Sequence, residues 1–318
     1  MKVTDYIHKA NGQTLISFEI LPPLKGGSID SIFNILDPLM EFRPPFIDVT
    51  YHREDYVYRT NNQGVPEKVS ISKRPGTVVI AQAIQNRYGV DAVPHLLCGG
   101  FTKEETEDAL IDMEYAKINN VLALRGDARK LEGRFYPEPG GHHYAIDLIR
   151  QIKNMNEGIY IDVDVKDGTK ANFCIGVAGY PEKHFEAPSF ESDMQHLKDK
   201  IDAGGEYIVT QMFFDNKKYF DFVKLCRDHG IQVPIIPGLK PLTRKSQLKS
   251  IPAAFYVELP NDLIKAIHSG SSPETIKQAG IEWCIYQSKE LKSAGVPSLH
   301  YYTMGDSETT RKIAEAVF

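Results

Sequence analysis

Glu19 is the residue of this 318-residue chain whose surroundings most clearly suggest chemistry. It lies in the run Leu15–Leu21, which is otherwise almost entirely apolar and is followed by two prolines. If this run is a strand, Ser17 and Glu19 share one face, because alternate side chains point to opposite sides. A buried carboxylate without a partner tends to be protonated, and a protonated Glu near neutral pH can act as a general acid. The alternative is a structural Glu that is exposed at a strand edge or paired with an Arg.

Eight short apolar runs bounded by turn residues are predicted strands, and the segments between them carry helix signals. Thr102–Glu105 reads as a capping box, Asp215 as a helix cap and Pro273 as the first turn of a helix. This alternation predicts an α/β fold, a (β/α)8 TIM barrel in a single domain, with a doubly wound sheet as the alternative. The predicted strands are Leu15–Leu21, Phe46–Tyr51, Ala92–Cys98, Asn120–Asp127, Cys174–Tyr180, Tyr207–Phe214, Pro234–Lys240 and Ser298–Met304.

Polar residues lie at the C-terminal ends of these runs, where the active site of a barrel is found. Each one alone has an ordinary structural explanation, but the same placement in eight strands indicates one shared site. In this arrangement Ser17 lies deeper than Glu19 on the inner face, and Ile16, Phe18 and Ile20 pack against helices. The strand-end residues are Glu19, Thr50, His95, Arg125, Gly126, Asp127, Tyr180, Gln211, Lys240 and Tyr301.

Composition and charge favour a small-molecule partner. The net charge is −5 with both signs spread along the chain, so nucleic acid is not an expected partner. The four cysteines are far apart, which predicts buried reduced thiols, and no apolar run approaches the roughly 20 residues of a membrane span. We therefore expect a cytoplasmic protein that does not enter the membrane. No metal site is expected, because the adjacent His142 and His143 would diverge on a helix and make a poor chelate.

Two predicted connections are unusually long. Residues 52–76 form a polar segment after the second strand, at the end of the barrel that carries active-site loops, and this segment is a candidate lid. The connection between Lys240 and Ser298 has room for more than one helix. No G-x-G-x-x-G, Walker or G-x-S-x-G motif is present, so a nucleotide cofactor would be held by scattered side chains and loop amides.

Nine short stretches, taken in order, resemble the flavin-dependent methylenetetrahydrofolate reductases of the short bacterial type. Each is short, and their order and spacing together carry the resemblance over almost the whole chain. They are Ser17–Glu19 with Pro22-Pro23, Val49–Tyr51, Pro94–Leu96, Ala123–Asp127, Tyr180–Glu182 with His184, Asp202–Gly204, Thr210–Asp215, Ile236–Gly238 and His300–Thr303.

The resemblance implies a barrel that holds FAD non-covalently and follows a ping-pong cycle. NADH or NADPH reduces the flavin and leaves, and 5,10-methylenetetrahydrofolate then takes the hydride and becomes 5-methyltetrahydrofolate. Glu19 is implied to be the general acid that assists opening of the methylene bridge. Asp127 is implied to lie beside flavin and pterin, where its charge favours the iminium cation. Gln211 is implied to bind the pterin, and Gln247 to make a second folate contact.

The resemblance also assigns a set of cofactor-binding residues. Four of them have helical spacing and could reach ribose and diphosphate, although spacing alone favours an ordinary solvated charged face. Residues 1–318 are expected to be one catalytic domain without a regulatory domain, and to form a homo-oligomer. The cofactor set is Thr50, His95, Arg125, Gly126, Asp127, Tyr144, Ala145, Tyr180, His184, Ala187, Asp193, His196, Asp199 and Lys200.

This chain departs from the family pattern at three places. His52-Arg53 follow Val49–Tyr51 where the family often has a Gly-Ala pair beside the flavin, and Met304–Asp306 replace the usual basic residue after the last strand. His196 and Asp199 stand where other residue types are common in the family. Two other functions stay open. One is a flavin-free, pterin-binding barrel that transfers a one-carbon group, and the other is a barrel that binds folate or nucleotide without turnover.

Overall fold

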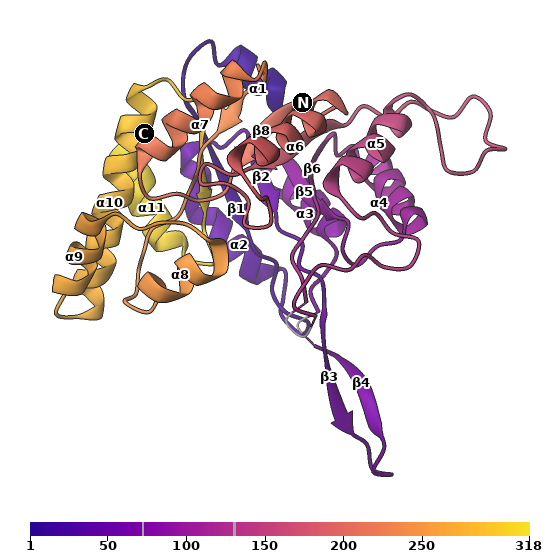
Figure 1. Ribbon diagram of the computed structural model, residues 1–318, viewed down its shortest axis with the longest axis horizontal. Coiled ribbons are helices and arrows are strands. Elements are labelled where there is room, and N and C mark those ends of the chain that lie inside the picture. Colours follow the sequence, from indigo (N-terminus) through magenta and orange to yellow (C-terminus); the bar gives the residue numbers. More distant parts are fainter. Residues whose placement is uncertain (72, 130–131) are drawn as a thin grey trace.

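The computed structural model describes residues 1–71, 73–129 and 132–318. In these ranges nine strands form a parallel sheet in the order β10-β11-β1-β2-β5-β6-β7-β8-β9, and helices surround it (Figure 1). The arrangement confirms the predicted (β/α)8 barrel, and every predicted run contains at least one strand. The strands are β1 (Leu15–Ile20), β2 (Phe46–Val49), β5 (Asp91–Leu97), β6 (Asn120–Leu124), β7 (Cys174–Gly179), β8 (Tyr207–Thr210), β9 (Ile235–Ile236), β10 (Gly238–Leu239) and β11 (Ser298–Tyr302).

The seventh predicted strand is divided in two at Pro237. β9 pairs with β8 on one side, and β10 pairs with β11 on the other, so this broken strand brings the two ends of the sheet together. Proline has no N–H to donate to a strand ladder, which explains the break. Its carbonyl oxygen still accepts a hydrogen bond of 3.1 Å from the backbone N–H of His300.

The helices begin where the sequence signals predict. Thr102 and Glu105 form the capping box of α4, the Asp215 side chain accepts a 2.9 Å hydrogen bond from the Lys217 N–H at the start of α7, and Pro273 begins α10. No helix in the described ranges combines the length and the apolar character that crossing a membrane requires. The helices are α1 (Val3–Lys9), α2 (Asp30–Leu36), η1 (Asp37–Phe42), α3 (Thr77–Tyr88), α4 (Lys103–Tyr115), α5 (Ala145–Asn156), α6 (Phe190–Asp202), α7 (Asn216–Asp228), α8 (Gln247–Phe255), α9 (Asn261–Ser269), α10 (Pro273–Ser293) and α11 (Ser307–Val317).

The core has a large layer between strands and helices and two smaller clusters, one of which includes inward strand residues. Ile16, Phe18 and Ile20 belong to the first, as the alternation predicts. The cluster with inward strand residues joins Val3 of α1 to Phe46 and Tyr207, among others. The four cysteines are buried free thiols, as expected.

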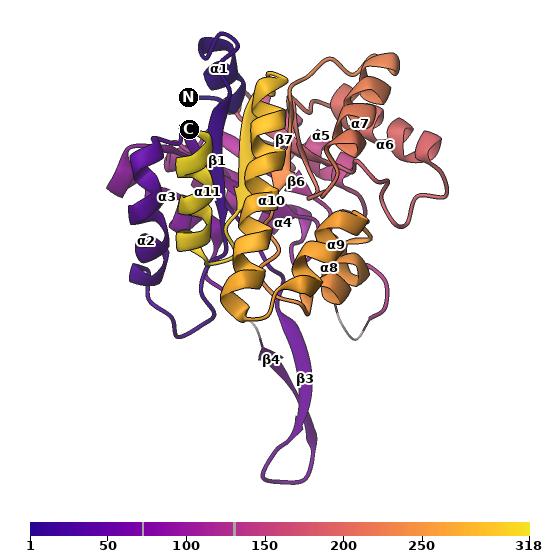
Figure 2. The same ribbon diagram turned by 90° about the vertical axis from the view of Figure 1, so that its left-hand side faces the viewer.

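Residues 52–76 contain a two-stranded antiparallel hairpin. Its strands, β3 (Asp55–Thr60) and β4 (Pro66–Ile71), pair with each other and not with the barrel sheet. Figures 1 and 2 show the hairpin projecting far from the barrel, at the end opposite α1. The segment therefore leaves the mouth side of the barrel, as expected, but it extends outward instead of lying over the mouth as a lid.

Candidate functional site

Glu19 lies at the mouth of the barrel among polar groups from three other strands or strand ends. Thr50 Oγ1 donates a 3.1 Å hydrogen bond to Glu19 Oε1. The second oxygen, Oε2, lies 3.5 Å from His95 Nε2 and 3.7 Å from His300 Nε2. The Glu19 side chain is only 13% exposed, so one carboxylate, one hydroxyl and two imidazoles share a nearly enclosed space. The structure thus brings Glu19, Thr50 and His95 together, as the sequence predicted.

Strand register explains this cluster. Glu19 is paired with Asp48 of β2 and with Tyr302 of β11, so these residues lie at one height in the barrel. One layer deeper, Ser17 Oγ lies 2.9 Å from His300 Nδ1, which holds the imidazole with Nε2 toward Glu19. Ser17 therefore occupies the deeper inner position that was predicted for it.

Two members of the cluster, Asp48 and His300, were missed in the sequence. Each is two residues along its strand from another inward side chain, so each lies on the inner face. This period of two could have identified both residues in the sequence. Tyr301 was predicted at the mouth instead, and this prediction is wrong. Its ring is buried in the outer core, and its hydroxyl donates a 2.9 Å hydrogen bond to Ser288 Oγ on α10.

The electrostatics of the cluster correct the expectation that Glu19 is protonated. Burial raises the pKa of Glu19, but the nearby His300 and His95 imidazoles and the hydrogen bond from the Thr50 hydroxyl outweigh burial, and the net pKa is lowered. Burial lowers the pKa of His300, but the charge of Asp48 and the contact with Glu19 reverse this, and the net pKa is raised. The lowered pKa of Glu19 and the raised pKa of His300 favour a Glu19 carboxylate beside a protonated His300.

Asp48 is the most enclosed acid of this cluster. It is 1% exposed, and neither carboxylate oxygen has a hydrogen-bond partner among the described residues. Its nearest ionisable partner is His95, whose Nε2 lies 3.6 Å from Asp48 Oδ2. A buried carboxylate is costly unless positive charge compensates it. The charge of Asp48 therefore favours the protonated form of His300.

A second group of predicted residues lies along the loops that follow β6 and β7. Arg125 forms an ion pair with Glu186 and stacks over the Phe135 ring at 5.0 Å. Tyr180 and His184 meet edge to face at 4.7 Å between ring centres. Gly126 has φ of 85°, a left-handed conformation that glycine adopts without strain.

Asp127 follows Gly126 and is exposed beyond the end of β6. Burial has the largest effect on the pKa of Tyr180 and raises it, and the negative charge of Asp127 raises it further. The Asp127 carboxylate therefore lies close enough to the Tyr180 hydroxyl to affect it. Lys240 also belongs to the mouth. Burial lowers the pKa of Lys240, while the charge of Glu19 is among the groups that act in the opposite direction.

The four residues at helical spacing in α6 divide into two pairs. The Asp193 carboxylate accepts a 2.9 Å hydrogen bond from the His184 backbone N–H, and Lys200 Nζ donates a 2.7 Å hydrogen bond to the Ala178 carbonyl. Burial lowers the pKa of Lys200 to about 8, and the charge of Asp193 opposes this shift. By contrast, His196 is exposed, and Asp199 accepts a hydrogen bond from Gln195 of the same helix. Only Asp193 and Lys200 are thus tied to the loops and strands of the candidate site.

Tyr144, Ala145 and Ala187 complete the predicted cofactor set. Tyr144 precedes α5, which begins at Ala145, and it lines a hollow of about 190 Å³ together with Arg125 and Glu186. Ala187 is buried, and its carbonyl oxygen accepts a hydrogen bond from Lys183 Nζ. The structure therefore brings Tyr144 to the Arg125 group.

The two predicted folate-binding glutamines make only local contacts. Gln211 lies just after β8, and its side-chain oxygen accepts a 2.9 Å hydrogen bond from the Met212 N–H. The Gln247 side-chain oxygen accepts hydrogen bonds of 2.6 and 3.0 Å from the N–H groups of Thr243 and Arg244. Gln247 thus stabilises the turn before α8, and its amide NH₂ is left for another contact.

Known proteins resemble this chain in sequence and in structure. Residues 3–317 match the family model described as methylenetetrahydrofolate reductase. The chain is 31% identical over 310 residues to the 5,10-methylenetetrahydrofolate reductase of Escherichia coli strain K12, covering 97% of this chain and 92% of that protein. It is 32% identical over 316 residues to methylenetetrahydrofolate reductase (NADH) 1 of Arabidopsis thaliana, covering 96% of this chain but 48% of that protein. The chain therefore spans about half the length of the plant relatives that it matches.

Among solved structures, the chain resembles an uncharacterized protein from Clostridium thermocellum that is described as binding two copies of 5-methyl-5,6,7,8-tetrahydrofolic acid. The TM-score is 0.58 with 15% sequence identity, and the alignment covers 98% of both chains. At this identity the likeness supports the barrel fold.

Proposed function

The chain belongs to the methylenetetrahydrofolate reductase family, and from this premise we propose that it reduces 5,10-methylenetetrahydrofolate to 5-methyltetrahydrofolate. The proposal includes bound FAD, NADH or NADPH as the reductant, and a ping-pong cycle. The observation that carries it is the Glu19 carboxylate at the barrel mouth, enclosed with Thr50, His95 and His300. This cluster stores a proton where a folate nitrogen would need one.

The residues present suit a flavin dinucleotide. Lys200 is a largely enclosed cation whose hydrogen bond goes to a carbonyl oxygen, and an anionic diphosphate would be a stronger partner. At Gly126 a Cβ would come within 3.1 Å of Leu97 Cδ1, so glycine lets the loop after β6 pack closely against the end of β5. The enclosed Lys200 supports FAD at this end of the barrel.

FAD would be held by residues of the predicted set that the structure groups around Arg125 and Lys200. Arg125 and Lys200 suit the diphosphate, and Asp193 suits a ribose hydroxyl. The chemistry that bound FAD supplies is storage of one hydride between the two substrates. His196 and Asp199 are less suited, because one is exposed and the other is bonded within its own helix.

The Glu19 and His300 pair is proposed to supply the proton for opening the methylene bridge. A bridging nitrogen leaves more readily once it is protonated, so a positioned acid accelerates this step. The proton rests on His300 Nε2, 3.7 Å from Glu19 Oε2, and reaches the folate nitrogen through the Glu19 carboxyl group. This distance exceeds that of a hydrogen bond, and such contacts often shorten when substrate binds.

Asp127 and Gln211 are proposed to act on the pterin. The Asp127 carboxylate would stabilise the cation that forms when the bridge opens, because a fixed negative charge beside the developing positive charge lowers its free energy. Gln211 would present its NH₂ group to the pterin, since its side-chain oxygen already accepts a hydrogen bond from Met212.

The test is the absorbance of the purified protein in the absence of oxygen. We expect a flavin spectrum that NADH or NADPH bleaches and that 5,10-methylenetetrahydrofolate restores. A colourless protein that FAD cannot reconstitute would instead favour the flavin-free one-carbon transferase. Bleaching without recovery would remove folate reduction from the proposal, and a coloured protein that neither substrate changes would favour binding without turnover.

A further inference from the structure

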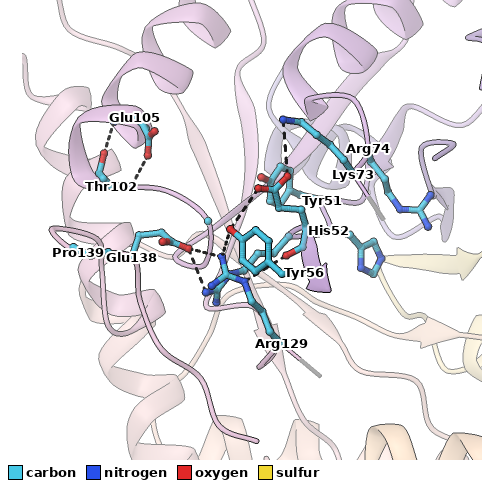
Figure 3. A pocket seen from close by; sticks show the side chains of 13 residues that line it. Tyr51, His52, Tyr56, Lys73, Arg74, Thr102, Glu105, Arg129, Glu138 and Pro139 are labelled. Carbon is cyan, nitrogen blue, oxygen red and sulfur yellow. Dashed lines mark hydrogen bonds and ion pairs between the residues drawn. The ribbon is translucent and has the colours of Figure 1, made fainter. Parts of the chain in front are cut away.

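A polar cavity of about 360 Å³ lies at the base of the β3–β4 hairpin, outside the proposed catalytic and cofactor-binding residues (Figure 3). The two ends of the hairpin segment form one part of its wall, and the start of α4 and the loop after β6 form another. Its volume is in the lower part of the range of about 300–1,000 Å³ that is usual for small-molecule sites. Its lining includes Tyr51, His52, Glu54, Lys73, Arg74 and Glu138.

Two arginines fix the shape of this cavity. Arg53 Nη2 lies 3.2 Å from Glu138 Oε1, and Arg129 Nη2 lies 2.8 Å from the same oxygen. Arg129 also pairs with Glu132 at 3.0 Å, and its guanidinium stacks over the Tyr56 ring at 4.6 Å. These contacts tie the hairpin base to the loop after β6. The charges of both arginines are compensated by glutamates.

Lys73 and Arg74 differ from these arginines because their charges are poorly compensated. The nearest carboxylate to Lys73 is Glu54, at 3.9 Å, and that oxygen already accepts a 2.6 Å hydrogen bond from Ser70. Arg74 donates to the backbone oxygen of Pro22, and no carboxylate of the described residues lies within 4.0 Å of its guanidinium. Arg74 thus lines the cavity without a carboxylate partner among the described residues, and Lys73 beside it has only a long ion pair with Glu54.

The cavity lies next to the proposed reaction centre. Burial lowers the pKa of the lining residue His52, and the charges of Glu19 and Asp127 act against this shift, so His52 lies near both carboxylates. Thr50, which donates to Glu19, is followed by Tyr51 and His52 in the cavity wall. On the other side, Pro22, which Arg74 contacts, comes three residues after Glu19. A ligand in the cavity would therefore lie beside a substrate bound at the barrel mouth.

We propose that this cavity binds the phosphate-bearing adenosine half of NADH or NADPH while the nicotinamide is at the barrel mouth. The inference rests on the proposed function. Lys73 and Arg74 would bind phosphate oxygens. The carboxylates of Glu105 and Glu138 each have one oxygen without a partner among the described residues, and these oxygens would accept ribose hydroxyls. The polyglutamate tail of a folate is a poorer match, because these carboxylates would repel it.

The experiment compares Lys73→Ala and Arg74→Gln with the control Arg59→Ala, which removes an exposed positive charge of the hairpin outside the cavity. Oxidation of NADH and of NADPH is measured with a soluble quinone as electron acceptor, so that folate is absent. We expect the KM for the dinucleotide to rise about tenfold in each cavity variant, with little change in kcat. The KM for methylenetetrahydrofolate, measured separately, should stay unchanged.

Two fragments identify which phosphate is bound. Adenosine 5′-diphosphate and adenosine 2′,5′-bisphosphate are titrated by calorimetry into the wild-type protein and the variants. Tighter binding of the first assigns the cations to the diphosphate, and tighter binding of the second assigns them to the 2′-phosphate of NADPH. Both results support the cavity, provided that Lys73→Ala weakens binding and Arg59→Ala does not.

Three results would overturn the inference. In the first, the KM for the dinucleotide in the cavity variants is the same as in Arg59→Ala. In the second, the KM for methylenetetrahydrofolate rises instead of the KM for the dinucleotide. In the third, neither cavity substitution weakens binding of the adenosine fragments. A wild-type protein that oxidises neither dinucleotide would instead contradict the proposed function. Lys73 is exposed, so its variant should fold normally, and thermal unfolding of each variant verifies this.

Discussion

At the scale of single residues, the position of Glu19 was predictable from sequence and its protonation state was not. The alternation in β1 determines which way the side chain points, and this information is local. Its pKa depends on His95 and His300, which come from strands far along the chain. Only the barrel register places these groups within 4 Å of one carboxylate. Asp48 and His300 were missed for the same reason.

The Glu19→Gln variant separates the two halves of the proposed cycle. Glutamine is nearly the same size and can still accept the hydrogen bond from Thr50, but it cannot relay a proton. We expect folate reduction to slow by about 10²-fold or more, while flavin bleaching by NADH or NADPH changes little. Stopped-flow absorbance measures the two half-reactions separately.

The matched control is Glu308→Gln, which neutralises an exposed carboxylate of α11. It should leave both half-reactions unchanged. An equal loss of both half-reactions in Glu19→Gln would show that Glu19 organises the site and does not transfer the proton.

At the scale of elements, the sequence predicted whether a segment is a helix or a strand better than it predicted where each element begins and ends. Strands and helices follow from apolar periodicity and caps, and the caps at Thr102 and Asp215 are confirmed by their hydrogen bonds. The break at Pro237 and the β3–β4 hairpin were not predicted. The break depends on how strand ends meet across the closing sheet, and the hairpin strands are half-buried or exposed, so they lack the apolar run used to identify strands.

Gly280 in α10 shows how closely one element can approach another. A Cβ at this position would lie 1.6 Å from the backbone oxygen of Leu242, in the loop after β10. Alanine normally stabilises a helix relative to glycine by about 1 kcal/mol. Here we expect Gly280→Ala to lower the free energy of unfolding by about 1–3 kcal/mol, because the backbone must move apart. Urea denaturation measures this difference.

Lys289→Ala, on the exposed face of α10, is the control and should change stability by no more than about 0.5 kcal/mol. A stabilised Gly280→Ala protein would mean that α10 and the loop after β10 are not in close contact.

At the scale of the whole molecule, the barrel and the hairpin differ in how they are stabilised. The barrel strands are hydrogen-bonded to one another and packed against helices in a large apolar core. The hairpin has two strands and an exposed outer half, and such a ribbon is marginally stable by itself. Its base is held by Arg53 and Arg129, which belong to the cavity wall. The outer half should therefore be dispensable for folding.

Shortening the hairpin tests this division. Tyr58 and Lys68 face each other across the strands, so residues 59–67 can be replaced by an Asn-Gly turn that joins this pair. We expect the free energy of unfolding to change by no more than about 0.5 kcal/mol and the dinucleotide KM to stay the same, because the cavity residues are retained. A larger loss that depends on protein concentration would show that the hairpin is buried against a second copy of the chain, since association stabilises by mass action. A larger loss without that dependence would place the hairpin in the folding unit of the barrel.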